Sequence, residues 1–252
     1  MADWATKRKN VYSLIILGVI ILGAGLPTYL FLYKKPTCTD GIKNGGEKGV
    51  DCGGICTKLC SADFSGPVYI WERLSHVSGN VYNVIAYVEN PNVSVEAPLA
   101  PYSFRLYDNN GVLITERKGA ITIPSGKKFA VFEQGIITAE KTPVKVTFEF
   151  IGQPKWAVST KNVSYKTSGV AYDMTGGFPR VNGLVINTTR DTYQNLDAIV
   201  LLYDTDGNII DFSKTVIDEL KGEDTAPVVF TWPTALRATP AKIDILVQKR
   251  DI

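Results

Sequence analysis

Hydrophobic and polar positions divide the chain into one long apolar run and a series of short alternating segments. Residues 11–33 contain no charged side chain over 23 positions. A helix of this length spans roughly 34 Å at about 1.5 Å per residue, which is enough to cross the hydrocarbon core of a membrane. Basic residues stand on both sides of the run, at 7–9 and at 34–35, so the flanking charge favours a cytoplasmic N-terminus only weakly. We predict a single-pass helix at 11–33, in contact with membrane lipid, after a cytoplasmic tail at 1–10.

A cleaved signal peptide is the alternative explanation for the apolar run. Gly23, Ala24 and Gly25 form a small-x-small site of the kind that a signal peptidase cuts. Pro27 next to this site argues against cleavage, as does the apolar stretch LPTYLFLY that would begin the mature chain. The sequence therefore favours an uncleaved signal anchor.

Alternating segments predict β-strands in the rest of the chain. Residues 144–150 (VKVTFEF) alternate without error, as in a strand with one buried face. A second such segment places Phe104 and Leu106 on one face. Strand-like segments recur roughly every ten residues and are broken by Gly, Pro and Asn, which favours an antiparallel sandwich over a helical fold. The one further helical element that we expect is a single turn at 218–221.

An internal repeat indicates two domains. The segment IAYVENPN…YSFRLYDNNGVLI resembles NGLVINTT…DAIVLLYDTDGNII, about 97 residues later. The repeat predicts tandem domains at 63–152 and 153–252, with an inserted loop at 90–101 in the first copy. The alignment pairs Asn90 with Asn187, Tyr107 with Tyr203, Gly111 with Gly207, Phe132 with Phe230 and Val146 with Ile243.

All four cysteines lie in one short module, residues 34–62. Cys38, Cys52, Cys56 and Cys60 are clustered, even in number and close to the predicted anchor, which indicates two disulfides in an oxidising compartment. Three pairings are possible, and the sequence does not choose among them. A zinc site built from all four thiolates is the alternative, although the three-residue spacers make it less favoured.

Several side chains with oxygen atoms lie among the glycines of the module and could bind a metal ion. Asp40, Asn44, Glu47 and Asp51 could hold calcium, with backbone carbonyls completing the shell. The spacing is not that of an EF-hand, and the alternative is that these residues form Asx-turns. We expect no other cofactor.

Two resemblances add to this interpretation. The string at 38–60 resembles a recurrent module of secreted and surface proteins, C-x-D-G-x-x-N-x-x-E-x-x-V-D-C-G-G-x-C-x-x-x-C, generally taken as a disulfide-bonded spacer. The string Phe104-Arg-Leu-Tyr-Asp108 is similar to the signature of FxLYD domains, small Ig-like sandwiches of bacterial and archaeal envelope proteins. In the second copy Val200 replaces the Phe. The predicted class is all-β, with two tandem Ig-like antiparallel β-sandwiches preceded by one transmembrane helix and a small disulfide-rich module.

Charge and composition narrow the function. The chain has 27 Lys and Arg against 25 Asp and Glu, and residues 36–252 carry 22 basic and 24 acidic residues. This balance provides no basic face for phosphates, so we expect no nucleic-acid partner. His76 is the single histidine, which excludes multi-histidine metal sites and leaves little room for histidine-based catalysis. The sequence therefore predicts that the protein is not an enzyme.

Several side chains have both a structural and a functional interpretation. The pairs Tyr107–Asp108 and Tyr203–Asp204 could contact a ligand, but a tyrosine packed on a sheet and an aspartate starting a hairpin turn explain them better. Trp71 and Trp156 stand near the start of each domain, where they are expected to plug a sandwich end or the domain junction rather than bind carbohydrate.

The anchor, the cysteine module and the sandwiches follow one another in chain order. We therefore predict a non-catalytic binding or spacer protein of the cell envelope, anchored in the cell membrane with its C-terminal domains outside the cytoplasm. Its partner would be an unknown protein or glycan. The alternatives are a structural subunit of an envelope membrane complex and, less favoured, an envelope hydrolase with a pocket around His76 or around a pair of carboxylates.

Overall fold

The chain divides into two compact units, Met1–Cys60 and Ser61–Ile252. The end of the predicted membrane segment at 30–33 and the predicted domain boundary at 62–63 lie outside the described residues. The computed structural model describes residues 2–25, 27–29, 35–60, 64–159 and 163–250.

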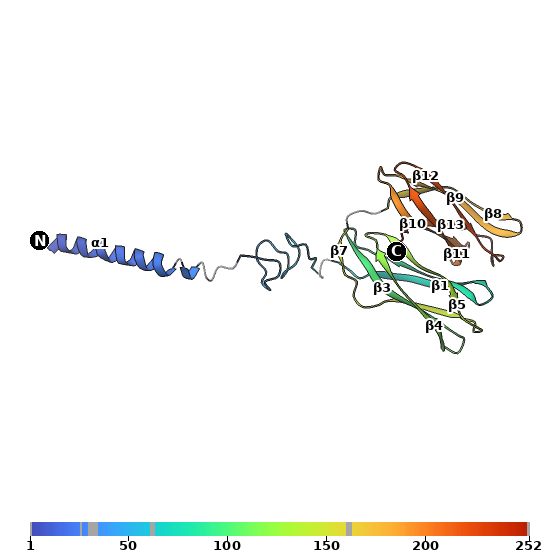
Figure 1. Ribbon diagram of the computed structural model, residues 1–252, viewed down its shortest axis with the longest axis horizontal. Coiled ribbons are helices and arrows are strands. Elements are labelled where there is room, and N and C mark those ends of the chain that lie inside the picture. The colour runs from blue at the N-terminus through green and yellow to red at the C-terminus, as the bar shows by residue number, and fades with distance from the viewer. Residues whose placement is uncertain (1, 26, 30–34, 61–63, 160–162, 251–252) are drawn as a thin grey trace. The chain divides into compact units, whose positions relative to one another are not determined.

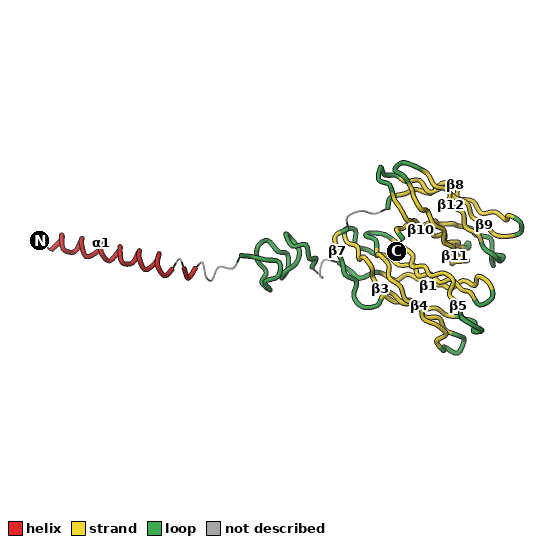
Figure 2. The backbone as a smooth tube through the Cα atoms, in the orientation of Figure 1, coloured by secondary structure: helices red, strands yellow, loops and turns green. Residues whose placement is uncertain are grey.

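The first unit begins with the expected apolar helix. Helix α1 (Ala2–Ile20) continues into a five-residue π-helical turn, η1 (Ile21–Gly25). The segment Thr6–Tyr29 is long and apolar enough to cross a membrane, and none of its most apolar window is buried inside the protein. A signal sequence meets the same criteria of length and composition. Residues 35–60 follow as turns and loops, with one isolated bridge between Gly49 and Cys52 (Figure 2).

The second unit is built from antiparallel strands, which confirms the predicted all-β class (Figure 1). Every strand pair in its described residues is antiparallel. The strands are β1 (Val68–Ser78), β2 (Val81–Glu89), β3 (Val95–Tyr107), β4 (Leu113–Ile123), β5 (Lys128–Ile137), β6 (Lys145–Phe150), β7 (Ala157–Val158), β8 (Tyr165–Thr175), β9 (Phe178–Asn187), β10 (Tyr193–Tyr203), β11 (Ile209–Leu220), β12 (Thr225–Thr231) and β13 (Lys242–Lys249).

The two halves of this unit have the same topology. In the first sandwich the sheet β1-β2-β5 faces the sheet β4-β3-β6, and in the second the sheet β8-β9-β12 faces the sheet β11-β10-β13. Strand β7 pairs with β3 outside this scheme. The register agrees with the sequence repeat, because Leu106 lies opposite Val146 just as Leu202 lies opposite Ile243.

One aligned pair of the repeat is wrong by one position. Phe132 lies opposite Ile85 and packs outside the first sandwich, whereas Phe230 lies opposite Val181 inside the second. The repeat therefore matches Phe132 with Val229. The β2–β5 pair has a register shift between Tyr82 and Val84, close to Phe132, and the equivalent β9–β12 pair has none. Comparison of the two sequences does not reveal this local difference.

Two local predictions are also wrong. The expected helical turn at 218–221 is the end of β11, where Glu219 and Leu220 pair with Gln194 and Tyr193. Pairing across the hairpin thus overrides the weak local helical tendency. The expected inserted loop at 90–101 is mostly strand, because β3 begins at Val95 and accommodates Leu99 as an irregularity with a φ of +51°.

Each sandwich encloses its own core, and a third apolar cluster joins the two. The joining cluster, here called the junction, lies between the sheet β1-β2-β5 and the sheet β11-β10-β13. It explains why Leu196–Leu202 in β10 is buried at every position, since one face of β10 points into the second core and the other into the junction. Its buried members are Ile85, Ala130, Ile199, Leu201, Ile209 and Phe212.

Candidate binding surfaces and the cysteine module

The four cysteines of the module form two disulfides. Cys38 is bonded to Cys56 with an S–S distance of 2.07 Å, and Cys52 to Cys60 with 2.08 Å. The described residues contain no free cysteine, so the zinc arrangement with four thiolates is not present. Because Gly49 and Gly53 approach the Cys60 sulfur closely, a Cβ at either position would lie within about 3.2 Å of it, and glycine is required there for packing.

The proposed calcium ligands are joined to one another by hydrogen bonds. Asp40 Oδ1 accepts a hydrogen bond from the Ile42 amide at 2.9 Å, as in an Asx-turn, and Asp40 Oδ2 accepts one from Asn44 Nδ2 at 3.1 Å. Both carboxylate oxygens of Asp51 accept from the Gly41 amide, at 3.0 and 2.9 Å. Within the described residues, Asn44 Oδ1 is buried without a hydrogen-bond partner.

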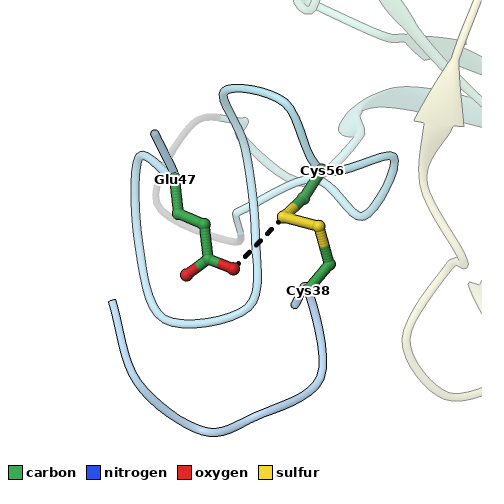
Figure 3. A group of neighbouring side chains, drawn as sticks. All are labelled: Cys38, Glu47 and Cys56. Carbon is green, nitrogen blue, oxygen red and sulfur yellow. Dashed lines mark hydrogen bonds between the residues drawn. A yellow bond between two sulfur atoms is a disulfide. The ribbon is translucent and has the colours of Figure 1, made fainter. Parts of the chain in front are cut away.

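Glu47 is the buried carboxylate of the module. Only 8% of the residue is exposed, and its Oε2 accepts a hydrogen bond from the Asp51 amide at 3.1 Å. Its Oε1 lies 3.3 Å from Cys56 Sγ (Figure 3). Glu47, Cys38 and Cys56 form the one group of three potential metal ligands within 4.8 Å in the described part of the chain. Because the two sulfurs are already bonded to each other, this group offers a cation the Glu47 carboxylate rather than thiolates.

Asp108 and Asp204 have the same role in equivalent hairpins. Asp108 Oδ1 accepts hydrogen bonds from the Asn110 and Val112 amides, both at 2.9 Å. Asp204 Oδ1 accepts from the amides two and four residues further on, at 3.0 and 2.8 Å. These backbone hydrogen bonds, led by the one from Asn208, lower the pKa of Asp204. The geometry supports the structural interpretation of the repeated aspartates.

His76 lies on β1, and among the described residues no carboxylate forms an ion pair with its ring. A ring nitrogen of His76 is 2.8 Å from the Gly79 carbonyl, and the ring packs on Tyr82 with centroids 5.1 Å apart. Burial raises the pKa of Asp211, and the nearby Ser75 side chain opposes this shift. The structure thus does not bring Ser75 and His76 together with a carboxylate as a catalytic triad would require.

The two tryptophans occupy the positions expected of structural residues. Trp71 packs against the junction and lies 5.1 Å from the Tyr87 ring, centroid to centroid. Trp156 packs against the first core and lies 5.4 Å from the Phe64 ring. Trp71 therefore lies at the junction, as expected, and Trp156 packs against the first core.

A side-chain amide links the sandwiches at one edge of the junction. Gln248 Oε1 on β13 accepts a hydrogen bond from the Ala130 amide at 3.1 Å, and Gln248 Nε2 donates one to the Ala130 carbonyl at 2.8 Å. Strand β5 is the edge of its sheet, so Gln248 satisfies backbone groups that no neighbouring strand pairs.

An ionic cluster lies beside this amide. The buried Asp197 carboxylate pairs with Lys214 at 3.3 Å and with Arg250 at 2.9 Å. The Lys214 ammonium also lies 5.4 Å from the centroid of the Phe132 ring of the first sandwich. These contacts were not predicted, because no local pattern connects residues so far apart in sequence.

Two tyrosines meet at the opposite side of the junction. Tyr87 and Tyr203 both pack against its apolar cluster. Burial, assisted by the negative charge of Asp244, raises the pKa of Tyr87 to about 12. Burial also raises the pKa of Tyr203, whose ring is 5.0 Å from the Lys242 ammonium. Tyr203 therefore contributes to domain packing rather than to an exposed ligand site.

Comparison with known proteins does not identify a family. No protein family matches the chain, and no curated protein matches it. Among solved structures, the chain is similar to a red sea bream transglutaminase, with a TM-score of 0.22 and 12% identity over 70% of this chain and 29% of that one. The chain thus spans less than a third of the transglutaminase, and a likeness this weak carries no argument about function.

Proposed function

We propose that this protein is a non-catalytic binding or spacer protein of the cell envelope, anchored in the cell membrane by its N-terminal helix with its FxLYD-like sandwiches outside the cytoplasm. The observation that carries the proposal is the junction. An apolar cluster with Ile85 on one side and Leu201 on the other, both fully buried, packs the two sandwiches together in one compact unit. Such a unit suits the presentation of a surface to a partner.

The cysteine module supports an extracytoplasmic location. Two disulfides with no free cysteine in the described residues are typical of a chain that folds in an oxidising compartment. The 26 residues at 35–60 lack helices and strands, so the cross-links supply the order that a hydrophobic core would otherwise provide.

Protease accessibility tests the location. We expect protease added to intact cells or spheroplasts to digest a tag placed after Ile252, while a tag before Ala2 is cut only after lysis. Protection of the C-terminal tag in intact cells would contradict the proposal. The same membranes, blocked with an alkylating reagent and mapped without reductant, should give the peptides Cys38–Cys56 and Cys52–Cys60. Four alkylated thiols would place the module in a reducing compartment.

Purification of partners separates a binding arm from a complex subunit. The full chain, solubilised in mild detergent, is compared with a variant whose helix is replaced by an unrelated single-pass helix. A stoichiometric membrane protein recovered only with the native helix would favour an envelope-complex subunit. A partner recovered with both helices, and lost when Ser61–Ile252 is removed, supports the proposed binding arm.

A further inference from the structure

A cleft of about 230 Å³ opens at one side of the junction. The first sandwich contributes the ends of β3, β4 and β5 to its walls, and the second contributes β8 and β13. Phe129 and Val247, which are almost fully buried, and Tyr165 supply apolar walls. At roughly 30 Å³ for each water-sized position, the volume suits a ligand of about eight non-hydrogen atoms.

Three lysines, Lys127, Lys128 and Lys249, line this cleft. Within the described residues, none of Lys127, Lys128 and Lys249 has a carboxylate oxygen within 4.0 Å. The one acidic residue among the lining residues, Glu96, already accepts a hydrogen bond from the Ser159 hydroxyl at 3.0 Å. The cleft therefore combines apolar walls with an excess of positive charge.

Three other cations near the junction are paired with carboxylates, in contrast to the three lysines of the cleft. Lys214 and Arg250 share the Asp197 carboxylate, and Lys242 pairs with Asp244 at 2.6 Å. Lysines that form no ion pair with a described carboxylate line the cleft. The cleft is therefore complementary to an anionic ligand in both charge and shape.

Lys127 is the least exposed of the three lysines. Its ammonium donates a hydrogen bond to the Val163 carbonyl and lies 5.9 Å from the centroid of the Tyr165 ring. The residue is half-buried, and this burial lowers the pKa of Lys127. A half-buried cation with only neutral partners is costly, and a bound anion would offset that cost.

We propose that this cleft binds a small carboxylate attached to an apolar group, with the carboxylate near Lys127 and Lys249 and the apolar group against Phe129 and Val247. The same chemistry could come from a short-chain fatty acid or from the C-terminal residue of a peptide. The proposal goes beyond the proposed function, since it concerns the folded sandwiches whichever side of a membrane they occupy. Failure of the protease experiment would leave it standing.

Calorimetric titration of the full chain in lipid nanodiscs tests the proposal. The probes are 4-methylpentanoate as the fatty acid and N-acetyl-leucine as the peptide terminus, and 4-methylpentanamide is the uncharged analogue. We expect saturable binding of at least one carboxylate, with the amide about tenfold weaker or worse. The tighter of the two carboxylates identifies the source of the ligand.

Variants assign the binding to the cleft. Lys127→Gln and Lys249→Gln should each weaken carboxylate binding about fivefold or more, whereas Lys166→Gln, on the exposed surface of β8, should leave it unchanged. A thermal melt establishes that each variant is folded. If Lys127→Gln does not fold, Lys249→Gln, at an exposed position, tests the cleft by itself. The proposal is overturned by equal affinity for carboxylate and amide, by unchanged binding in a folded cleft variant, or by no saturable binding up to about 10 mM.

Discussion

Arg105 and Leu201 occupy the same position of the repeat but have opposite environments. Arg105 faces outward from β3 and pairs with Glu116 at 2.9 Å and with Glu149 at 2.8 Å. Leu201, on the equivalent face of β10, is completely buried in the junction. Ser103 and Glu116 likewise stand where the second copy has the junction residues Ile199 and Phe212, so the two faces differ at several aligned positions.

Exchange of Arg105 and Leu201 tests the junction. Leu201→Arg should destabilise the protein by about 3 kcal/mol or more, because a guanidinium would be buried among apolar side chains without a partner. Arg105→Leu should change the free energy of unfolding by no more than about 1 kcal/mol, because it removes only exposed ion pairs. Chemical denaturation measures both, and equal effects of the two substitutions would contradict the assignment.

Gln248 is predicted to stabilise the junction through its two hydrogen bonds to Ala130. Gln248→Ala leaves a backbone amide and carbonyl of β5 without these partners, so we expect a loss of about 1–3 kcal/mol in the free energy of unfolding. The control is Gln194→Ala, an exposed glutamine of β10 in the same sheet. A loss no larger than that of the control would indicate that water replaces the side chain without cost.

The junction should weaken in alkali. Tyr87 has a pKa near 12 in the folded protein, against about 10 in the unfolded chain. Because the folded state holds this proton more tightly, the corresponding stability is complete below pH 10 and is lost as the pH rises through about 12. Tyr87→Phe should therefore make stability less dependent on pH between 10 and 12. Tyr107→Phe, which is remote from the junction, is the matched control, and identical pH profiles for both variants would contradict the prediction.

Asn90 and Asn187 are predicted to be equivalent in energy as well as in position. Asn90 Nδ2 donates hydrogen bonds to the carbonyls of Val95 and Pro124, and Asn187 Nδ2 donates to the carbonyl of Asp191 among others. Both residues are at least 98% buried. Substitution of either by Ala should cost about 2–3 kcal/mol, since it leaves buried carbonyls without donors. Asn109→Ala, in an exposed hairpin turn, should cost far less in the same denaturation assay.

Reduction should unfold the cysteine module alone. Neither sandwich contains a cysteine, so dithiothreitol should accelerate proteolysis within 38–60 while Ser61–Ile252 stays resistant. We expect a calcium chelator to leave cleavage of the oxidised module unchanged, because backbone amides already occupy the Asp40 and Asp51 carboxylates. Faster cleavage with chelator, reversed by calcium, would instead establish the calcium site.

The strands and the repeat could be predicted because they rest on local alternation, as at 144–150, and on two similar strings. The disulfide pairing could not, because four cysteines allow three arrangements and the choice depends on how the glycines turn. The run Leu196–Leu202 departs from simple alternation, and this departure could have predicted the junction. Its apolar residues point to both faces, which indicates a strand buried on both sides and hence the junction. The lysines of the cleft give no local signal, since Lys127 and Lys249 line one cleft only after the sandwiches pack.

The junction also limits how the repeat can assemble. It joins the β1-β2-β5 face of the first copy to the β11-β10-β13 face of the second, so the equivalent faces at the two ends remain outside. At those ends Arg105 takes the place of Leu201, and Asn182, hydrogen-bonded to Asp173 at 3.0 Å, takes the place of Ile85. A second molecule that stacked through the same contact would have to bury Arg105 and Asn182. The terminal repeats of solenoid proteins have polar outer faces that prevent such stacking in the same way. The duplication therefore gives a closed pair whose ends resist growth into a head-to-tail filament.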